Sequence, residues 1–153
     1  MFLIALVLIL FFVFSGTVSA VLPITLASSL SADAVQAKNT QTPIVIFTTA
    51  SDCEYCEVLR ENVFQFLPND RRLILREVIM DSTTTFESFN NESLTYSQFA
   101  ERHEVDFSPT VLFLSDEGHE IAAPLVGVLT LDYYRYYFDK AVTIATKALT
   151  SDL

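Results

Sequence analysis

The sequence predicts one α/β domain of order β-α-β-α-β-β-α, a four-stranded mixed sheet flanked by helices. Short β-branched, apolar runs typical of buried strands alternate with longer segments whose apolar residues recur every three or four positions, as in helices. The first two strands are joined by a helix, so they should pair in parallel with a right-handed crossover. The last two strands are joined by a short turn and must be antiparallel.

The first strand and helix follow Pro43. Residues 44–48 (Ile-Val-Ile-Phe-Thr) predict a buried strand. A helix is expected next, because Ser51 followed by Glu54 matches a capping box. Pro-Asn-Asp at 68–70 should end this helix. Its apolar stripe has spacings of three and four and comprises Cys56, Leu59, Val63 and Phe66.

The rest of the chain completes the sheet and its helical cover. The predicted elements are a strand at 73–80, a polar loop at 81–91, a helix at 93–104, strands at 110–114 and 119–126, and a helix from 130 to about 149. The turn Asp116-Glu117-Gly118 joins the last two strands as a hairpin. Asp132 suits the positive end of the last helix.

The N-terminal segment differs from the rest in charge. No charged side chain precedes Asp33, and residues 2–14 are continuously apolar. Such a core, followed by small residues ending in Val18-Ser19-Ala20, is typical of a secretory signal peptide cleaved after Ala20. An uncleaved membrane anchor is the alternative, because residues 2–27 are uncharged and long enough to span a bilayer. Both predict an exported protein, periplasmic or otherwise extracytoplasmic, where a disulfide persists.

We therefore expect a signal peptide or membrane anchor at 1–20, a linker rich in Ala, Ser and Thr at 21–42, and one domain at 43–153. The 153 residues carry a net charge of −10, which disfavours nucleic acid as a partner because phosphate binding depends on Lys and Arg. Two cysteines are too few for a disulfide framework or a four-thiolate zinc site.

The two cysteines form the motif Cys53-Glu54-Tyr55-Cys56, directly after the first predicted strand. Cysteines three residues apart share one side of a helix, and in the first turn free N–H groups and the helix dipole favour a thiolate. Cys53 lies nearer the helix start, so we expect it to be the more exposed cysteine and to attack a substrate disulfide. Cys56 would then resolve the mixed disulfide.

With this motif the chain resembles the thioredoxin-fold superfamily over residues 43–149. The likeness also rests on Phe107-Ser108-Pro109-Thr110 before a strand, on the hairpin, and on Gly127 before the last helix. It implies that Pro109 is cis and faces the disulfide, and that Ser108 offers backbone hydrogen bonds to the substrate. Glu54 and Tyr55 are further candidates for substrate contact. The export signal and short domain look most like exported thiol–disulfide oxidoreductases, including the thioredoxin-like proteins of bacterial sulfur-oxidation systems.

The chain departs from thioredoxin around the motif. Asp52 replaces the Trp before the first cysteine, and Glu54-Tyr55 replaces Gly-Pro. Phe47 occupies the place of the buried acid that acts on the resolving thiol, which leaves proton handling at Cys56 without an acceptor.

The motif is also strongly acidic. Only Arg60 opposes four acids: Asp52, Glu54, Glu57 and Glu61. Negative neighbours disfavour a thiolate, whereas a strong oxidant needs a stabilised one. The sequence therefore predicts a reductant, or a partner of an isomerase, rather than a strong oxidant.

These observations predict an exported oxidoreductase that exchanges disulfides with protein substrates and with an unidentified redox partner. No organic cofactor or metal is expected, because the two sulfurs carry the electrons. One alternative is a copper- or zinc-handling protein that adds His103 or His119 to the two cysteines, although both histidines lie in surface-like polar stretches. A non-catalytic interaction module is the other alternative. The aromatic residues at 133–138 are interpreted as packing rather than ligand stacking.

Overall fold

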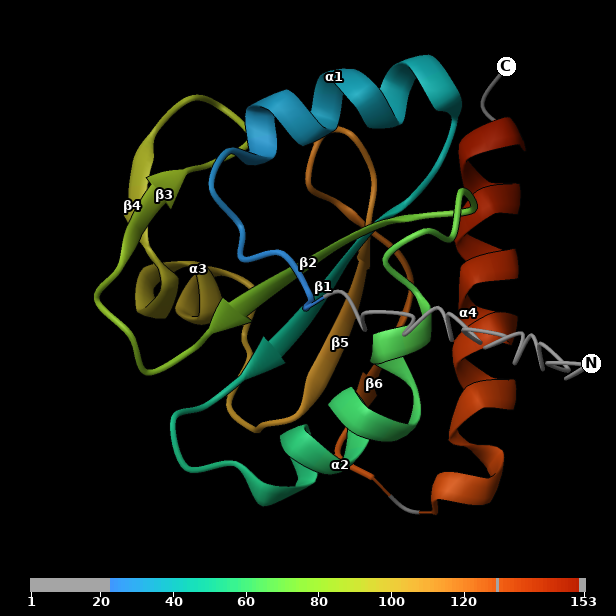
Figure 1. Cartoon of the computed structure of the whole chain (residues 1–153). Coiled ribbons are helices and arrows are strands. Elements are labelled where there is room, and N and C mark those ends of the chain that lie inside the picture. Colours follow the sequence, from blue (N-terminus) through green and yellow to red (C-terminus); the bar gives the residue numbers. More distant parts are fainter. Residues whose placement is uncertain (1–22, 129, 152–153) are drawn as a thin grey trace, which may run out of the picture.

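A computed structural model describes residues 23–128 and 130–151. Their main sheet has the order β2-β1-β5-β6, with β1 at Ile44–Thr49, β2 at Ile74–Ile79, β5 at Thr110–Leu114 and β6 at Glu120–Val126 (Figure 1). Strand β1 pairs in parallel with β2 and antiparallel with β5, which pairs antiparallel with β6. The predicted α/β class and four-stranded mixed sheet are therefore confirmed.

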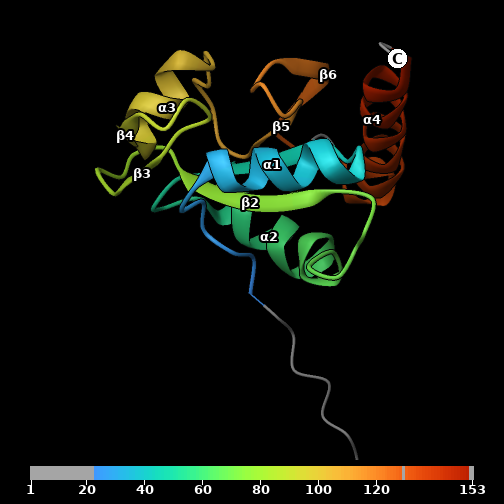
Figure 2. The same cartoon turned by 90° about the horizontal axis from the view of Figure 1, so that it is seen from above.

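Helices cover both faces of this sheet: α1 at Leu30–Thr40, α2 at Glu54–Asn62, α3 at Tyr96–Arg102 and α4 at Leu131–Ser151 (Figure 2). The central strand β1 is buried throughout, and successive side chains point to opposite faces. Val45 and Phe47 join the core that α2 and α4 cover. Ile44 and Ile46 join the core that α1 and α3 cover.

The described part of the predicted linker at 21–42 belongs to the folded domain, which corrects the boundary at Pro43. The Ser29 side chain caps α1 by accepting a hydrogen bond from the Ala32 N–H. Leu30 and Ala37 are buried in the core beneath α1. The Ala27 N–H also donates to the Glu77 carbonyl at the edge of β2. The buried face of α1 is narrow and its remaining surface polar, so its composition resembled a tether.

The segment 1–20, predicted as a signal peptide or anchor, lies outside the described residues. Among the helices that the structure describes, none combines the length and apolar character needed to cross a bilayer.

The helix after the motif is shorter than its apolar stripe predicted. Helix α2 ends at Asn62, and a 3₁₀ turn, η1 at Phe64–Phe66, follows it. The tighter winding changes which side chains face the core. Phe64 is consequently buried while Phe66 is 66% exposed, so the placement of Phe66 in the stripe was wrong.

The polar loop predicted at 81–91 contains a strand. Strand β3 at Thr85–Glu87 pairs antiparallel with β4 at Ser93–Thr95, and both are three residues long. Because β4 occupies residues 93–95, helix α3 starts later than predicted. A capping box between Thr95 and Gln98 marks its start.

Because α1 belongs to the domain, Leu30→Ala should lower the free energy of unfolding by about 2–5 kcal/mol, since it empties a fully buried site. Val35→Ala, on the exposed side of the same helix, should change it by less than about 0.5 kcal/mol. Urea unfolding followed by circular dichroism measures both values. Equal, small effects would show that α1 is a detachable tether.

Candidate functional site

Three connections meet at the carboxyl end of β1. The chain leaves β1 through residues 50–53, β5 begins with Thr110 opposite Thr48, and β6 ends with Val126 opposite Thr110. The motif, the residues before β5 and the residues after β6 therefore share one end of the sheet (Figure 1).

Cys53 and Cys56 form a disulfide in the first turn of α2. Cys53 is itself the helix N-cap, and its Sγ accepts a hydrogen bond from the Cys56 N–H at 3.1 Å. The predicted capping box of Ser51 and Glu54 is therefore wrong: the helix begins two residues later, and Glu54 is its first residue. The Ser51 N–H donates to the Asp81 carboxylate at 3.1 Å instead.

The two sulfurs differ in access. Cys56 is only 1% exposed and lies in the core beneath α2 and α4, whereas Cys53 is partly exposed at that core's margin. This is the order expected from their places in the helix. A partner molecule can therefore reach the Cys53 sulfur, while Cys56 is shielded by protein.

Ser108 and Pro109 lie directly before β5, and the peptide bond between them is cis. The Pro109 carbonyl accepts a hydrogen bond from the Gly127 N–H at 2.8 Å, which ties this loop to the end of β6. Gly127 has φ +68°, a conformation that favours glycine. Pro109 is buried and Ser108 is half-buried, so part of the loop remains open to solvent.

Glu54 and Tyr55 are both exposed on the first turn of α2, next to Cys53. Asp52, immediately before the motif, is exposed as well. The surface around the accessible sulfur is therefore acidic, with one large aromatic ring.

A buried acid beside Phe47 is the feature that the sequence reasoning missed. Glu77 is the register partner of Phe47 on β2 and is 5% exposed. Its carboxylate accepts hydrogen bonds from the Thr49 hydroxyl at 2.8 Å and from Arg60 of α2 at 2.7 and 2.8 Å. The available signal was the one acid within the strand Ile74–Ile79, which is apolar apart from this residue and the neighbouring Arg76.

The ion pair determines what Glu77 contributes. The hydrogen bond to Glu77 is the main reason that the pKa of Arg60 is raised, although partial burial opposes it. The carboxylate is therefore engaged by Arg60 and Thr49 rather than free to take a proton from Cys56. The pair joins the motif helix to the sheet, and the Arg60 guanidinium lies 5.7 Å from the Phe47 ring centre.

The two histidines belong to other elements than the motif: His103 ends α3, and His119 follows the turn between β5 and β6. His119 is exposed after the hairpin turn, and His103 stacks on Phe99 with ring centres 4.3 Å apart. Burial lowers the pKa of His103. Across residues 23–128 and 130–151, no three His, Cys, Asp or Glu side chains gather in a metal-binding group.

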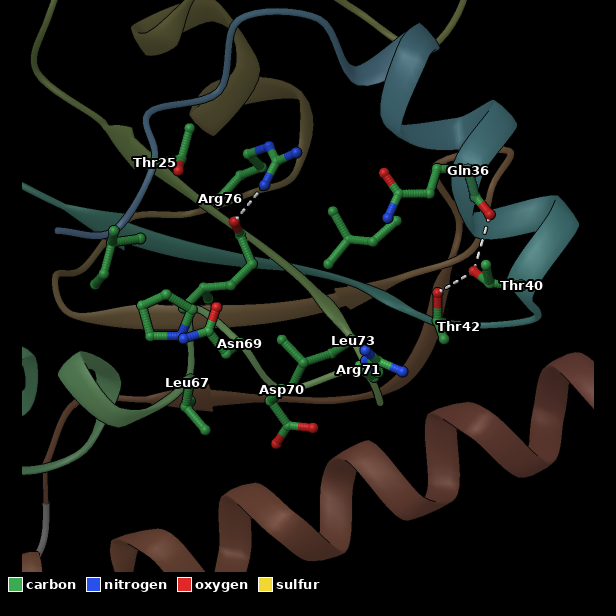
Figure 3. A pocket seen from close by; sticks show the side chains of 14 residues that line it. Thr25, Gln36, Thr40, Thr42, Leu67, Asn69, Asp70, Arg71, Leu73 and Arg76 are labelled. Atoms are coloured by element: carbon green, nitrogen blue, oxygen red, sulfur yellow. Dashed lines mark hydrogen bonds between the residues drawn. The ribbon is translucent and has the colours of Figure 1, made fainter. Parts of the chain in front are cut away.

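A cavity of about 410 Å³ lies elsewhere, at the outer edge of β2 (Figure 3). Gln36 and Thr42 line it on the α1 side, and Arg71 and Arg76 line it on the β2 side. Neither cysteine nor Pro109 contributes to its walls, so it is separate from the disulfide site.

Comparison with known proteins agrees with this geometry. A family model described as a thioredoxin-like domain matches residues 30–141. The DsbH oxidoreductase structure has a TM-score of 0.59 and 17% identity, covering 85% of this chain and 92% of its own. Thioredoxin NaTrxh from Nicotiana alata has a TM-score of 0.55 and 16% identity, and the match covers 80% of this chain and 97% of that thioredoxin. Oxidized thioredoxin O2 from Arabidopsis thaliana has a TM-score of 0.53 and 16% identity, and the match covers 76% of this chain and 92% of that thioredoxin. No curated protein sequence matches.

Glu77→Gln should destabilise the fold by about 2–3 kcal/mol, because it leaves the Arg60 charge without its buried counter-charge. This is below the usual cost of breaking a buried pair, since the Arg60 side chain keeps 30% exposure. Glu57→Gln removes the exposed partner of the same arginine and should cost less than about 1 kcal/mol. Chemical denaturation of the oxidised protein measures both changes in the free energy of unfolding. Equal losses of stability in the two variants would contradict the assignment of Glu77 as the buried partner of Arg60.

Proposed function

Since the chain belongs to the thioredoxin-like family and carries a redox disulfide, we propose that it is an exported thiol–disulfide oxidoreductase that reduces protein disulfides. The observation that carries the proposal is the disulfide in the first turn of α2, with Cys53 partly exposed and Cys56 buried.

The proposed reaction begins from the reduced dithiol. The Cys53 thiolate, favoured by the Cys56 N–H and the helix dipole, attacks one sulfur of a substrate disulfide. A mixed disulfide forms, and the other substrate sulfur leaves as a thiolate that takes up a proton. Cys56 then loses its proton and attacks the Cys53 sulfur, which releases the second substrate thiol. Two electrons pass to the substrate, and the Cys53–Cys56 disulfide remains.

Regeneration needs a dithiol donor, which is the expected redox partner. No side chain at the Phe47 position can accept the Cys56 proton, and Glu77 is engaged by Arg60. We therefore assign this proton to the departing substrate thiolate or to water.

The Ser108 backbone and Pro109 form one side of the proposed docking surface, and Tyr55 and Glu54 form the other.

The charge around the motif supports the reductant direction. Asp52, Glu54 and Glu57 are exposed near Cys53, and Arg60 is already engaged by Glu57 and Glu77. A thiolate in this field is less stable, so the reduced protein gives up its electrons more readily.

Export is proposed from residues 1–20, as a cleaved signal peptide or as a membrane tether. The finer resemblance to the thioredoxin-like proteins of bacterial sulfur-oxidation systems stays a prediction. The copper- or zinc-handling alternative would require stoichiometric metal in the purified protein, which elemental analysis measures.

The exchange mechanism predicts that Cys56→Ser accumulates mixed disulfides with its substrates, because the resolving sulfur is gone. Cys53→Ser should form none and should lose turnover of a model protein disulfide. Non-reducing electrophoresis followed by mass spectrometry reports the adducts. A Cys56→Ser variant that forms no adducts, or adducts formed equally by Cys53→Ser and Cys56→Ser, would contradict the exchange mechanism.

The reductant proposal predicts a reduction potential nearer about −270 mV, as in thioredoxin, than about −120 mV, as in strongly oxidising periplasmic enzymes. Asp52→Asn combined with Glu54→Gln should raise the potential by about 20 mV, because it removes charges that oppose the thiolate. Glu101→Gln, an exposed acid on α3, is the matched control and should not shift it. Equilibration with glutathione measures the reduction potentials of the wild type and of both variants. A strongly oxidising wild-type potential would refute the proposal that the protein acts as a reductant.

A further inference from the structure

The cavity of about 410 Å³ at the outer edge of β2 has the size and the lining of a small-molecule site. Pockets that hold small ligands have volumes of roughly 300–1,000 Å³. The apolar side chains of Ile24, Leu67 and Leu73 form part of its wall, and polar side chains of α1 and of the loop before β2 form the rest. The cavity therefore suits a molecule that has both an apolar body and a polar group.

Arg71 lies on the wall of this cavity and has no ion pair within residues 23–128 and 130–151. Each of the other five arginines contacts a carboxylate at 2.9 Å or closer. The chain has 19 Asp or Glu against nine Lys or Arg, so an arginine without an acid is an exception here. Asp70 also lines the cavity, but Arg72 engages its carboxylate at 2.6 Å. Arg71 therefore brings a positive charge that no contacting carboxylate neutralises.

The edge of β2 adds a backbone donor. The Glu77 N–H donates outward, to the Thr25 carbonyl at 2.9 Å. Peptide groups two residues apart on a strand face the same side, so the N–H and carbonyl of Leu75 also face this outer edge. The Leu75 carbonyl accepts a hydrogen bond from the Arg76 guanidinium at 2.8 Å. Leu75 is only 7% exposed, yet its N–H has no acceptor in the part of the chain that the structure describes.

Two side-chain amides add further donors. Gln36 and Asn69 line the cavity, and neither amide forms a hydrogen bond with another described residue. Figure 3 shows the Gln36 side chain extending from α1 into this space. Buried N–H groups are normally paired, so the unpaired Leu75 N–H calls for an acceptor oxygen from outside the chain.

These donors and the apolar wall select among ligand classes. A guanidinium and a backbone N–H together favour a carboxylate, which accepts from both. A net charge of −10 opposes multiply charged anions such as phosphate, whereas a single charge on an apolar body also gains from burial. An added β-strand would need the carbonyl of Leu75 as well as its N–H, and Arg76 already occupies that carbonyl.

We propose that this cavity binds a small monocarboxylate with a short apolar chain. Its carboxylate accepts hydrogen bonds from Arg71 and from the Leu75 N–H, and its chain packs against Ile24, Leu67 and Leu73. This binding site does not depend on the proposed function, because neither cysteine lines the cavity.

The test titrates the full-length, ¹⁵N-labelled protein with sodium hexanoate and follows its amide signals by NMR. Hexanol supplies the apolar body alone, and inorganic phosphate supplies the negative charge alone. We expect hexanoate to shift the Leu75 amide and the Gln36 side-chain amide until they saturate. Hexanol and phosphate should each bind at least about tenfold more weakly, because each lacks one half of the recognition.

A pair of charge-matched variants locates the carboxylate. Arg71→Gln should weaken hexanoate binding about tenfold, because it removes the charged donor. Lys140→Gln makes the same change in net charge at an exposed position of α4 outside the cavity, and it should leave the affinity unchanged. Both residues are exposed, so both variants should melt at the wild-type temperature without ligand.

Three outcomes would overturn the site. The first is hexanoate that produces no saturable shift at the Leu75 amide. The second is hexanol or phosphate that binds as tightly as hexanoate, which would show that only apolar burial or only charge is recognised. The third is an equal loss of hexanoate affinity in Arg71→Gln and Lys140→Gln, which would show an effect of net charge rather than of a contact in the cavity.

Discussion

The hydrogen bond from the Cys56 N–H to the Cys53 sulfur is the interaction on which the site depends. It makes a cysteine, rather than a serine or an acid, the cap of the helix that begins where β1 ends. Because β1 is the buried central strand, this start is fixed at one end of the sheet. The same helical turn buries Cys56, so the start of α2 exposes the Cys53 sulfur to a partner and shields the Cys56 sulfur.

Opposing electrostatic effects act on that sulfur. The helix start favours a thiolate, while the exposed acids around the motif disfavour it. Arg60 does not offset these acids, because Glu57 and the buried Glu77 engage it. The chain thus places an ion pair beneath the motif helix, next to the strand position that Phe47 occupies. The pair anchors the helix and leaves the proton of Cys56 to water or to the departing substrate.

The sequence predicted the elements whose signals are local and strong. The strand at 110–114 and the motif after the first strand were recognisable from apolar runs and from a pattern of four residues. Helix α1 was not, because only a few small or apolar side chains along it contact the core. The β3–β4 pair was missed because its strands are three residues long. The role of Glu77 depends on its register against Phe47, which a linear pattern does not reveal.

Alkylation of the reduced protein tests the central claim most directly. With a limiting amount of iodoacetamide near neutral pH, peptide mass spectrometry reports which cysteine reacts first. The account predicts modification of Cys53, with Cys56 modified only after unfolding, because one sulfur is accessible at the helix start and the other is buried. Equal reactivity of the two cysteines, or faster reaction at Cys56, would contradict it.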